Sequence, residues 1–320
     1  MKTLDFNKMT EQEAKQTLEQ LTDQAELVRA AKELPNGDLR KKAIYKITDE
    51  NSLLEIINGN EADYLTTRTA TYETEEYGEM EITGTSGSYT AGGNYTKINK
   101  YQKTVDLRQE AELRRGELYA SKQFIEIEAE AKKGNYMLGS PHTQVFLGDC
   151  YAWQVDTLEE LLVPKPYFET AMYWYKQAVE NGSAYAMHGL ATSYWNLHFR
   201  GIAAGKPNPS ATANAKEYEE KAKENGYKEG AETPHGKIFF EKGLWYYTNA
   251  AVPKPYAIAH LFIKIAARHN YAPALYKLGA LYESGGEGIE EDIKKALKYY
   301  EDAARIGCAD ASEAVKRLRG

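Results

Sequence analysis

The chain has 320 residues, a length that corresponds to about two domains or to one long repeat array. Its 42% hydrophobic content is enough for a folded core. With 47 acidic against 40 basic residues the formal net charge is −7, which disfavours a nucleic-acid-binding protein. No apolar run approaches the roughly 20 residues of a membrane span.

The N-terminal region is predicted to be helical. Residues 10–34 fit one amphipathic helix, because apolar residues such as Leu18 and Leu21 recur at three- and four-residue steps. Thr10 and Glu13 have the spacing of a capping box at its start. Shorter helices are expected at 38–47 and 51–58. The first residues lack the apolar stretch of a secretory signal, so we expect a cytoplasmic protein unless a signal has been removed.

The composition changes between residues 66 and 103, where Thr, Tyr, Gly, Ser and Glu dominate. Weak alternation around Met80 and Ile82, and again around Tyr95 and Ile98, allows a small β-hairpin. A flexible excursion is the equal alternative, given the Gly- and Ser-rich stretch 84–93. We therefore expect three parts: 1–65, the 66–103 insertion, and 104–320.

Internal repetition begins after residue 104. The clearest repeat reads Ala274-x3-Leu278-Gly279-x2-Tyr282, then Asp292-x2-Lys295-Ala296-x2-Tyr299-Tyr300-x2-Ala303-Ala304-x2-Gly307. Weaker copies place a small residue at 116, 148, 191 and 243 and an aromatic three positions later, at Tyr119, Tyr151, Tyr194 and Tyr246. The intervals between these small residues, 32, 43, 52 and 36, are those of helical-hairpin repeats, with Gly201–Ser210 inserted as a loop in the longest.

This pattern resembles the Sel1-like repeat, a relative of the tetratricopeptide repeat, over roughly residues 104–320. The resemblance implies an all-α fold, a right-handed α–α solenoid of stacked helical hairpins. The small residues would let the two helices of a hairpin approach closely. Asp292 is expected to cap the second helix of its hairpin, and Gly307 to end it.

A solenoid of this kind presents the first helix of each hairpin on its concave face, which is where partners bind. Counting two, six and nine residues from the leading Ala of each copy predicts an increasingly aromatic stripe. The candidate partner-binding residues are His188, Thr192, Trp195, Phe240, Leu244, Tyr247, Tyr276 and Glu283. The alternative is that several of these rings pack against the next hairpin.

Motifs for catalysis, metals or cofactors are not recognisable. The six histidines share no compact ligand spacing, and the two cysteines, Cys150 and Cys308, form no CxxC pair. The Gly-rich stretch 285–288 lacks the Lys-Ser/Thr of a phosphate-binding loop and is followed by acids. We therefore expect neither a metal nor a cofactor.

The sequence favours a non-catalytic bacterial adaptor or scaffold that binds another protein or peptide, and no nucleic acid. One alternative is an immunity or inhibitor protein that masks a basic toxin or enzyme, which the net negative charge would favour. The other is a hydrolase whose site lies between residues 1–103 and the solenoid.

Overall fold

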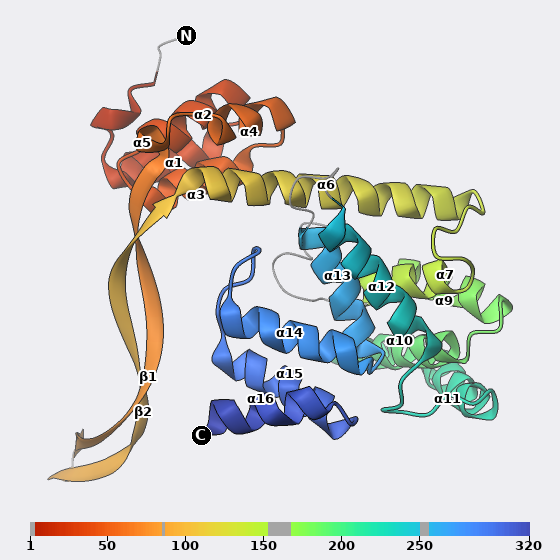
Figure 1. Cartoon of the computed structure of the whole chain (residues 1–320). Coiled ribbons are helices and arrows are strands. Elements are labelled where there is room, and N and C mark those ends of the chain that lie inside the picture. Colours follow the sequence, from red (N-terminus) through yellow and green to blue (C-terminus); the bar gives the residue numbers. More distant parts are fainter. Residues whose placement is uncertain (1–3, 85–86, 153–167, 250–255) are drawn as a thin grey trace. The chain divides into compact units, whose positions relative to one another are not determined.

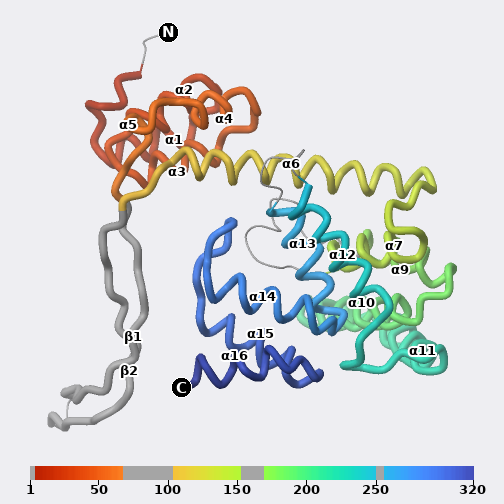
Figure 2. Tube along the Cα trace, in the orientation of Figure 1, coloured from red at the N-terminus to blue at the C-terminus, as the bar shows by residue number. Residues whose placement is uncertain are grey.

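The computed structural model describes residues 4–84, 87–152, 168–249 and 256–320 (Figures 1 and 2). It divides into two compact units, an N-terminal unit, Met1–Arg114, and a C-terminal unit, Arg115–Gly320. The N-terminal unit begins with short helices: η1 (Phe6–Lys8), α1 (Glu11–Gln20), α2 (Gln24–Glu33), α3 (Gly37–Lys46), α4 (Glu50–Ile57) and α5 (Glu61–Tyr64).

The segment 10–34, predicted to form one helix, forms two helices. The prediction of a single continuous helix is therefore wrong. The capping box at Thr10 is confirmed: its hydroxyl accepts from the Glu13 backbone N–H. The helix nevertheless ends at Gln20, and the Asp23 side chain caps a new one by accepting from the Glu26 N–H at 2.9 Å. An acid that can bind the backbone of the next turn competes with helix continuation, and here it starts α2.

The insertion forms an antiparallel β-hairpin, the first of the two predicted alternatives. Its strands are β1 (Leu65–Gly84) and β2 (Gly87–Asp106), of 20 residues each. Their register pairs Leu65 with Asp106 and Gly84 with Gly87. The hairpin is therefore much longer than the small one expected, because the weak alternation in its sequence hides its length.

The C-terminal unit is an α–α solenoid, as predicted. Its helices, in chain order, are α6 (Leu107–Lys132, which starts in the N-terminal unit), α7 (His142–Ala152), α9 (Phe168–Glu180), α10 (Ala184–Ala203), α11 (Pro209–Glu224), α12 (Pro234–Thr248), α13 (Tyr256–Arg268), α14 (Ala272–Ser284), α15 (Ile293–Arg305) and α16 (Ala309–Arg319). The helices α7 and α9, α10 and α11, α12 and α13, and α14 and α15 pack as hairpins. Within the described ranges, no helix is long and apolar enough to cross a membrane.

Two details of the repeat prediction need correction. The degenerate first copy around Gly116 is not a hairpin, because α6 continues unbroken for 26 residues. The expected loop Gly201–Ser210 is shorter, because α10 continues to Ala203 and α11 begins at Pro209. By contrast, Asp292 accepts from the Lys295 N–H at 2.9 Å, and Gly307 has a φ of 98°, so both predicted end signals are confirmed.

The small residues do bring helices together. A Cβ on Gly279 would lie 2.7 Å from the ring of Tyr300, and one on Gly243 would lie 2.8 Å from Ile263. These distances are shorter than van der Waals contact, so no larger side chain fits without movement. The hairpin geometry predicted from the repeat therefore rests on glycine at these places.

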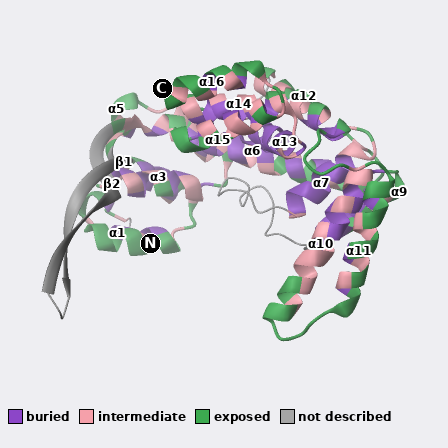
Figure 3. Ribbon diagram, turned by 90° about the horizontal axis from the view of Figure 1, so that it is seen from below, coloured by how far each residue is buried: buried purple, intermediate pink, exposed green. Residues whose placement is uncertain are grey.

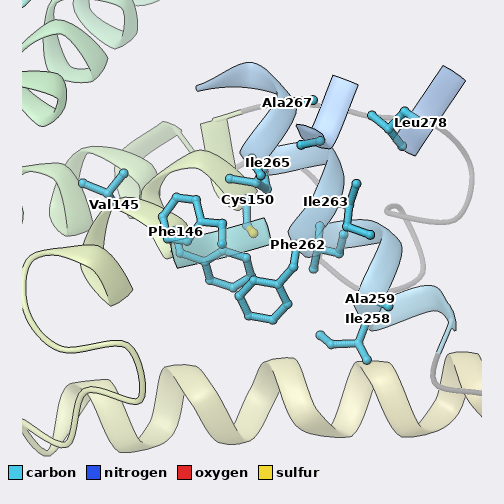
Figure 4. Packing of buried hydrophobic residues seen from close by; sticks show 14 of the residues in the cluster. Val145, Phe146, Cys150, Ile258, Ala259, Phe262, Ile263, Ile265, Ala267 and Leu278 are labelled. Carbon is cyan, nitrogen blue, oxygen red and sulfur yellow. The ribbon is translucent and has the colours of Figure 1, made fainter. Parts of the chain in front are cut away.

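The core of the solenoid lies around α13. Every residue from Ala257 to Ala267 is buried, so this helix is covered on all sides. Phe262 stacks on Phe146 of α7 with ring centroids 4.2 Å apart (Figure 4). The ring centroid of Phe239 on α12 lies 5.7 Å from that of Phe146. Through these contacts the α12–α13 hairpin packs directly against α7.

Candidate protein-binding face

The helix α10 carries the first three predicted site residues, and a capped turn fixes where it begins. Gly182 ends α9 with a φ of 81°, a conformation that glycine adopts without strain. Ser183 then caps α10, with its hydroxyl accepting from the Ala186 N–H at 3.2 Å. The turn therefore sets which residues of α10 face α9 and which face away.

Tyr175 of α9 fixes the approach of α10. A Cβ on Gly148 would lie 2.6 Å from its ring, and one on Gly189 would lie 2.7 Å from it. The ring is thus held between α7 and α10 at positions where only glycine fits. Its hydroxyl donates to Asp149 at 2.6 Å, so the buried ring keeps a polar partner.

Asp149 is the centre of a buried polar network. Its other neighbours are the Tyr185 hydroxyl at 3.2 Å and His269 Nε2 at 2.8 Å. His269 Nδ1 in turn lies 2.6 Å from the hydroxyl of Thr233. Burial, and after it the Asp149 charge, raises the pKa of Tyr185 well above its ordinary value. The network joins α7, α9 and α10 to the chain segments around α12 and α13.

The sequence of Thr233 hydroxyl, His269 imidazole and Asp149 carboxylate is also the order of groups in nucleophilic hydrolases. Here Asp149 and His269 are fully buried and Thr233 is 8% exposed. The three groups connect α7 to the segments that precede α12 and follow α13. A buried carboxylate with three donors satisfies the requirement that an interior charge be bonded on all sides.

A small cavity lies beside this network. It has a volume of about 60 Å³ and is lined by Ala152, Tyr175, Tyr185, His188, Gly189, Thr192, Ser193 and Asn196. Small-molecule sites usually have volumes of about 300–1,000 Å³. The cavity is therefore smaller than a usual small-molecule site, and two of the predicted site residues, His188 and Thr192, lie in its wall.

An exposed apolar stripe continues from this cavity along α10. Trp195 is half-buried and donates its indole N–H to Glu219 at 2.7 Å, with its ring stacked 5.9 Å from Phe199. Phe199 is 61% exposed, and Ile202, one turn further on, is 53% exposed. In Figure 3 the far end of the α10–α11 hairpin consists of intermediate and exposed residues. The spacing of four and three residues places the three side chains on one side of the helix.

The predicted residues on α12 make contacts within the solenoid. Phe240 packs on Tyr271 with centroids 5.4 Å apart, and Leu244 is half-buried. Tyr247 hydrogen-bonds to His260, and the Lys277 ammonium lies 5.0 Å from the centroid of its ring. These rings therefore contribute to packing between neighbouring helices.

The predicted residues on α14 are engaged as well. Tyr276 lies 5.4 Å from the ring of Tyr300, and Glu283 accepts from the Tyr300 hydroxyl at 2.8 Å. Glu283 also binds Arg317, and this hydrogen bond is the largest of the influences that lower the pKa of Glu283. Of the eight predicted residues, His188, Thr192 and Trp195 share one helix with the exposed stripe.

Sequence reasoning missed two groups of residues. Phe199 and Ile202 could have been found, because they extend the Trp195 stripe at helical spacing. The Asp149–His269 and His142–His235 contacts could not, because their partners are 120 and 93 residues apart in the chain. Among the described residues, no group of three or more metal-ligating side chains comes together.

A stack of short helical hairpins with an exposed apolar side is the construction of a helical-repeat protein. Residues 166–183, 184–227 and 272–308 match the model of the Sel1 repeat family, so the chain carries Sel1 repeats. Sel1 repeats generally act as protein-interaction modules. A search of curated proteins gave no match.

Solved structures that resemble the chain include a Sel1 repeat protein from Oxalobacter formigenes, at 22% identity, with a TM-score of 0.25. The match covers 65% of this chain and 55% of that one. A second is a protective antigen of uropathogenic Escherichia coli that displays an SLR fold, at 18% identity, with a TM-score of 0.24. This second match covers 66% of this chain and 41% of that one.

Proposed function

We propose that the protein is a non-catalytic bacterial adaptor that binds another protein through the α10 side of its solenoid. The observation that carries the proposal is an apolar stripe beside a cavity of side-chain size, in which Trp195 is half-buried and Phe199 and Ile202 are exposed. Aromatic anchors next to a small pocket are typical of the residues that dominate protein interfaces. The Sel1 repeats support the same class of function.

The predicted residues on α12 and α14 have a secondary role in this proposal. Tyr247 and Tyr276 are partly buried against neighbouring helices, so substituting them would disturb packing as well as binding. Phe199 is the better probe, since most of its side chain contacts solvent. A polar substitution there removes apolar contact area and leaves the solenoid core intact.

The test is capture of partners from a bacterial lysate with the purified chain, followed by mass spectrometry. Phe199→Asp should reduce the yield of the specific partner at least tenfold, because a carboxylate would enter an apolar contact. Ile125→Asp is the matched control, since Ile125 is also 61% exposed but lies on α6. Equal capture by the wild type and both variants would overturn the proposal.

A second candidate is an inhibitor that masks a basic protein, and one observation favours it. Residues 1–114 contain 21 acidic and 15 basic residues, whereas 115–320 contain 26 and 25. The negative charge is therefore concentrated in the N-terminal unit. Binding that weakens steeply with salt and that Phe199→Asp leaves unchanged would favour this function over the adaptor.

A further inference from the structure

Two histidines from distant parts of the sequence meet at the starts of two helices. His142 is the first residue of α7 and His235 the second of α12, and their Nδ1 atoms lie 2.8 Å apart. The rings meet edge to face, with centroids 4.8 Å apart. At this distance one Nδ1 must carry a hydrogen and the other must accept it.

The pair can close with either ring as the donor. Ser183 lies 3.4 Å from Nε2 of His235, and its oxygen accepts from the Ala186 N–H. Because a hydroxyl has one hydrogen and two lone pairs, Ser183 can either donate to Nε2 of His235 or accept from it. In both arrangements one neutral ring donates its Nδ1 hydrogen to the Nδ1 of the other.

Protonation of both rings breaks this arrangement. A pair with one added proton still has one Nδ1–H donor and one Nδ1 acceptor, but with two added protons two N–H groups face each other at 2.8 Å. The N-terminal ends of α7 and α12 carry partial positive charge, which further opposes cations at these positions. Closure and protonation of both rings therefore exclude each other.

The other titratable and charged groups around the pair do not offset this. The groups on the packed elements are Asp149 on α7, Tyr185 and His188 on α10, Tyr227 before α12, and Arg268 and His269 at the end of α13. Asp149 favours the charged form of His235, but its oxygens are shared by His269 and two tyrosines. Burial, followed by His269 and His142, lowers the pKa of His235 to about 3, and burial lowers that of His142.

We propose that the His142–His235 pair is an acid-sensitive joint, which holds the start of α12 against the start of α7 while at least one Nδ1 can accept a hydrogen bond, and which opens when both rings are protonated. Tyr185 lies 5.9 Å from the His235 ring and lines the α10 cavity. Opening would therefore alter the binding face, a consequence that rests on the proposed function.

Hydrogen–deuterium exchange of the free full-length protein tests the joint without a partner. After correction for the intrinsic pH dependence, peptides at the starts of α7 and α12 should open about tenfold more at pH 5.5 than at pH 7.5. Peptides of α15, which contains no histidine, should not respond. His235→Phe keeps a ring and removes the pair, so exchange in this variant should not depend on pH after the correction. Exchange in His142→Phe should show an intermediate pH dependence.

A wild-type response in His235→Phe would overturn the joint. Histidine NMR titration of the wild type keeps the proposal falsifiable if that variant does not fold: the His235 ring should titrate together with the rise in exchange. Titration without increased exchange, or increased exchange with His235 still neutral, would contradict it. Because these measurements use the free protein, their failure is distinct from a failure of partner capture by Phe199→Asp.

Discussion

The hairpins α10–α11 and α12–α13 occupy equivalent places in the repeat but are packed very differently. On α13, all residues from Ala257 to Ala267 are buried. On α11, burial is restricted to Ala211, Ala215 and Ala222. The helix α13 is covered on every side, whereas α11 contacts its neighbour along one alanine stripe.

The difference shows that a shared hairpin motif does not determine how a hairpin stacks. The apolar residues of α13 lie on all sides of the helix, and Phe262 and its neighbours pack against α7. The outward side of α11 is charged, so it has no apolar surface for the next hairpin. The composition of the second helix therefore decides whether a hairpin is enclosed or projects, and the exposed stripe of α10 belongs to the projecting one.

The largest expected effect is at the enclosed hairpin. Phe262→Ala removes a fully buried ring from its stack with Phe146 and should lower the free energy of unfolding by about 3–5 kcal/mol. The matched change on the projecting hairpin is Tyr218→Ala, which loses a half-buried stack with Tyr194 worth about 1 kcal/mol. Denaturant titration measures both, and equal losses would break the comparison.

The second-largest loss of stability is expected in the buried network around Asp149. Asp149→Asn retains the shape but removes the charge that three donors share, and should cost about 1.5–3 kcal/mol of unfolding free energy. The control is Asp292→Asn, because asparagine caps a helix as well as aspartate and should change stability by about 0.3 kcal/mol or less. Thermal and chemical denaturation should both show that Asp149→Asn destabilises the protein more than Asp292→Asn does.

Acid should loosen the enclosed hairpin. Burial, then the nearby charges of Lys264 and Lys277, lowers the pKa of His260 on α13 to about 3 in the folded state. The stabilising neutral form is complete above the unfolded pKa of about 6.5, and stability falls as the pH drops from there towards 3. At pH 5.5 the loss is about 1.4 kcal/mol from this histidine. Unfolding curves at pH 7.5 and 5.5 of the wild type and of His260→Phe isolate it from the contribution of His235, and an equal loss in both proteins would contradict the enclosed environment of α13.

The smallest effect on stability is expected at the tip of the projecting hairpin. Phe199→Ser changes a side chain that is 61% exposed and should alter the free energy of unfolding by no more than about 0.5 kcal/mol. A loss of more than 2 kcal/mol would show that Phe199 supports the fold, and would remove the reason for treating it as a binding residue.

The repeat made the solenoid predictable because its glycines and end signals act locally. Gly279 and Asp292 do what their positions in the motif indicated. The break at Asp23 was not predictable from apolar spacing, because a single side-chain hydrogen bond outweighs a continuous amphipathic pattern. The packing of α12 and α13 on α7 depends on contacts between segments about 90 to 120 residues apart, which no local pattern encodes.

The proposed binding face was likewise predictable only in part. Helical counting gave His188, Thr192 and Trp195, because a surface stripe on one helix is a local property. It could not separate these from Tyr247 or Tyr276, whose exposure depends on the next hairpin. Nor could it show that α10 projects, which follows from the missing apolar side of α11.

The separation of Asp149 from His269 has a consequence for synthesis of the protein. The two residues are 120 positions apart, so at 5–20 residues per second the ribosome makes the histidine about 6–24 s after the aspartate. Until then α7, α9 and α10 can be complete, with Tyr175 and Tyr185 in place, but the carboxylate lacks its imidazole. The segment that follows the α12–α13 hairpin therefore completes the interior around α7, α9 and α10, and a nascent chain that stops before His269 leaves this charge without one of its three partners.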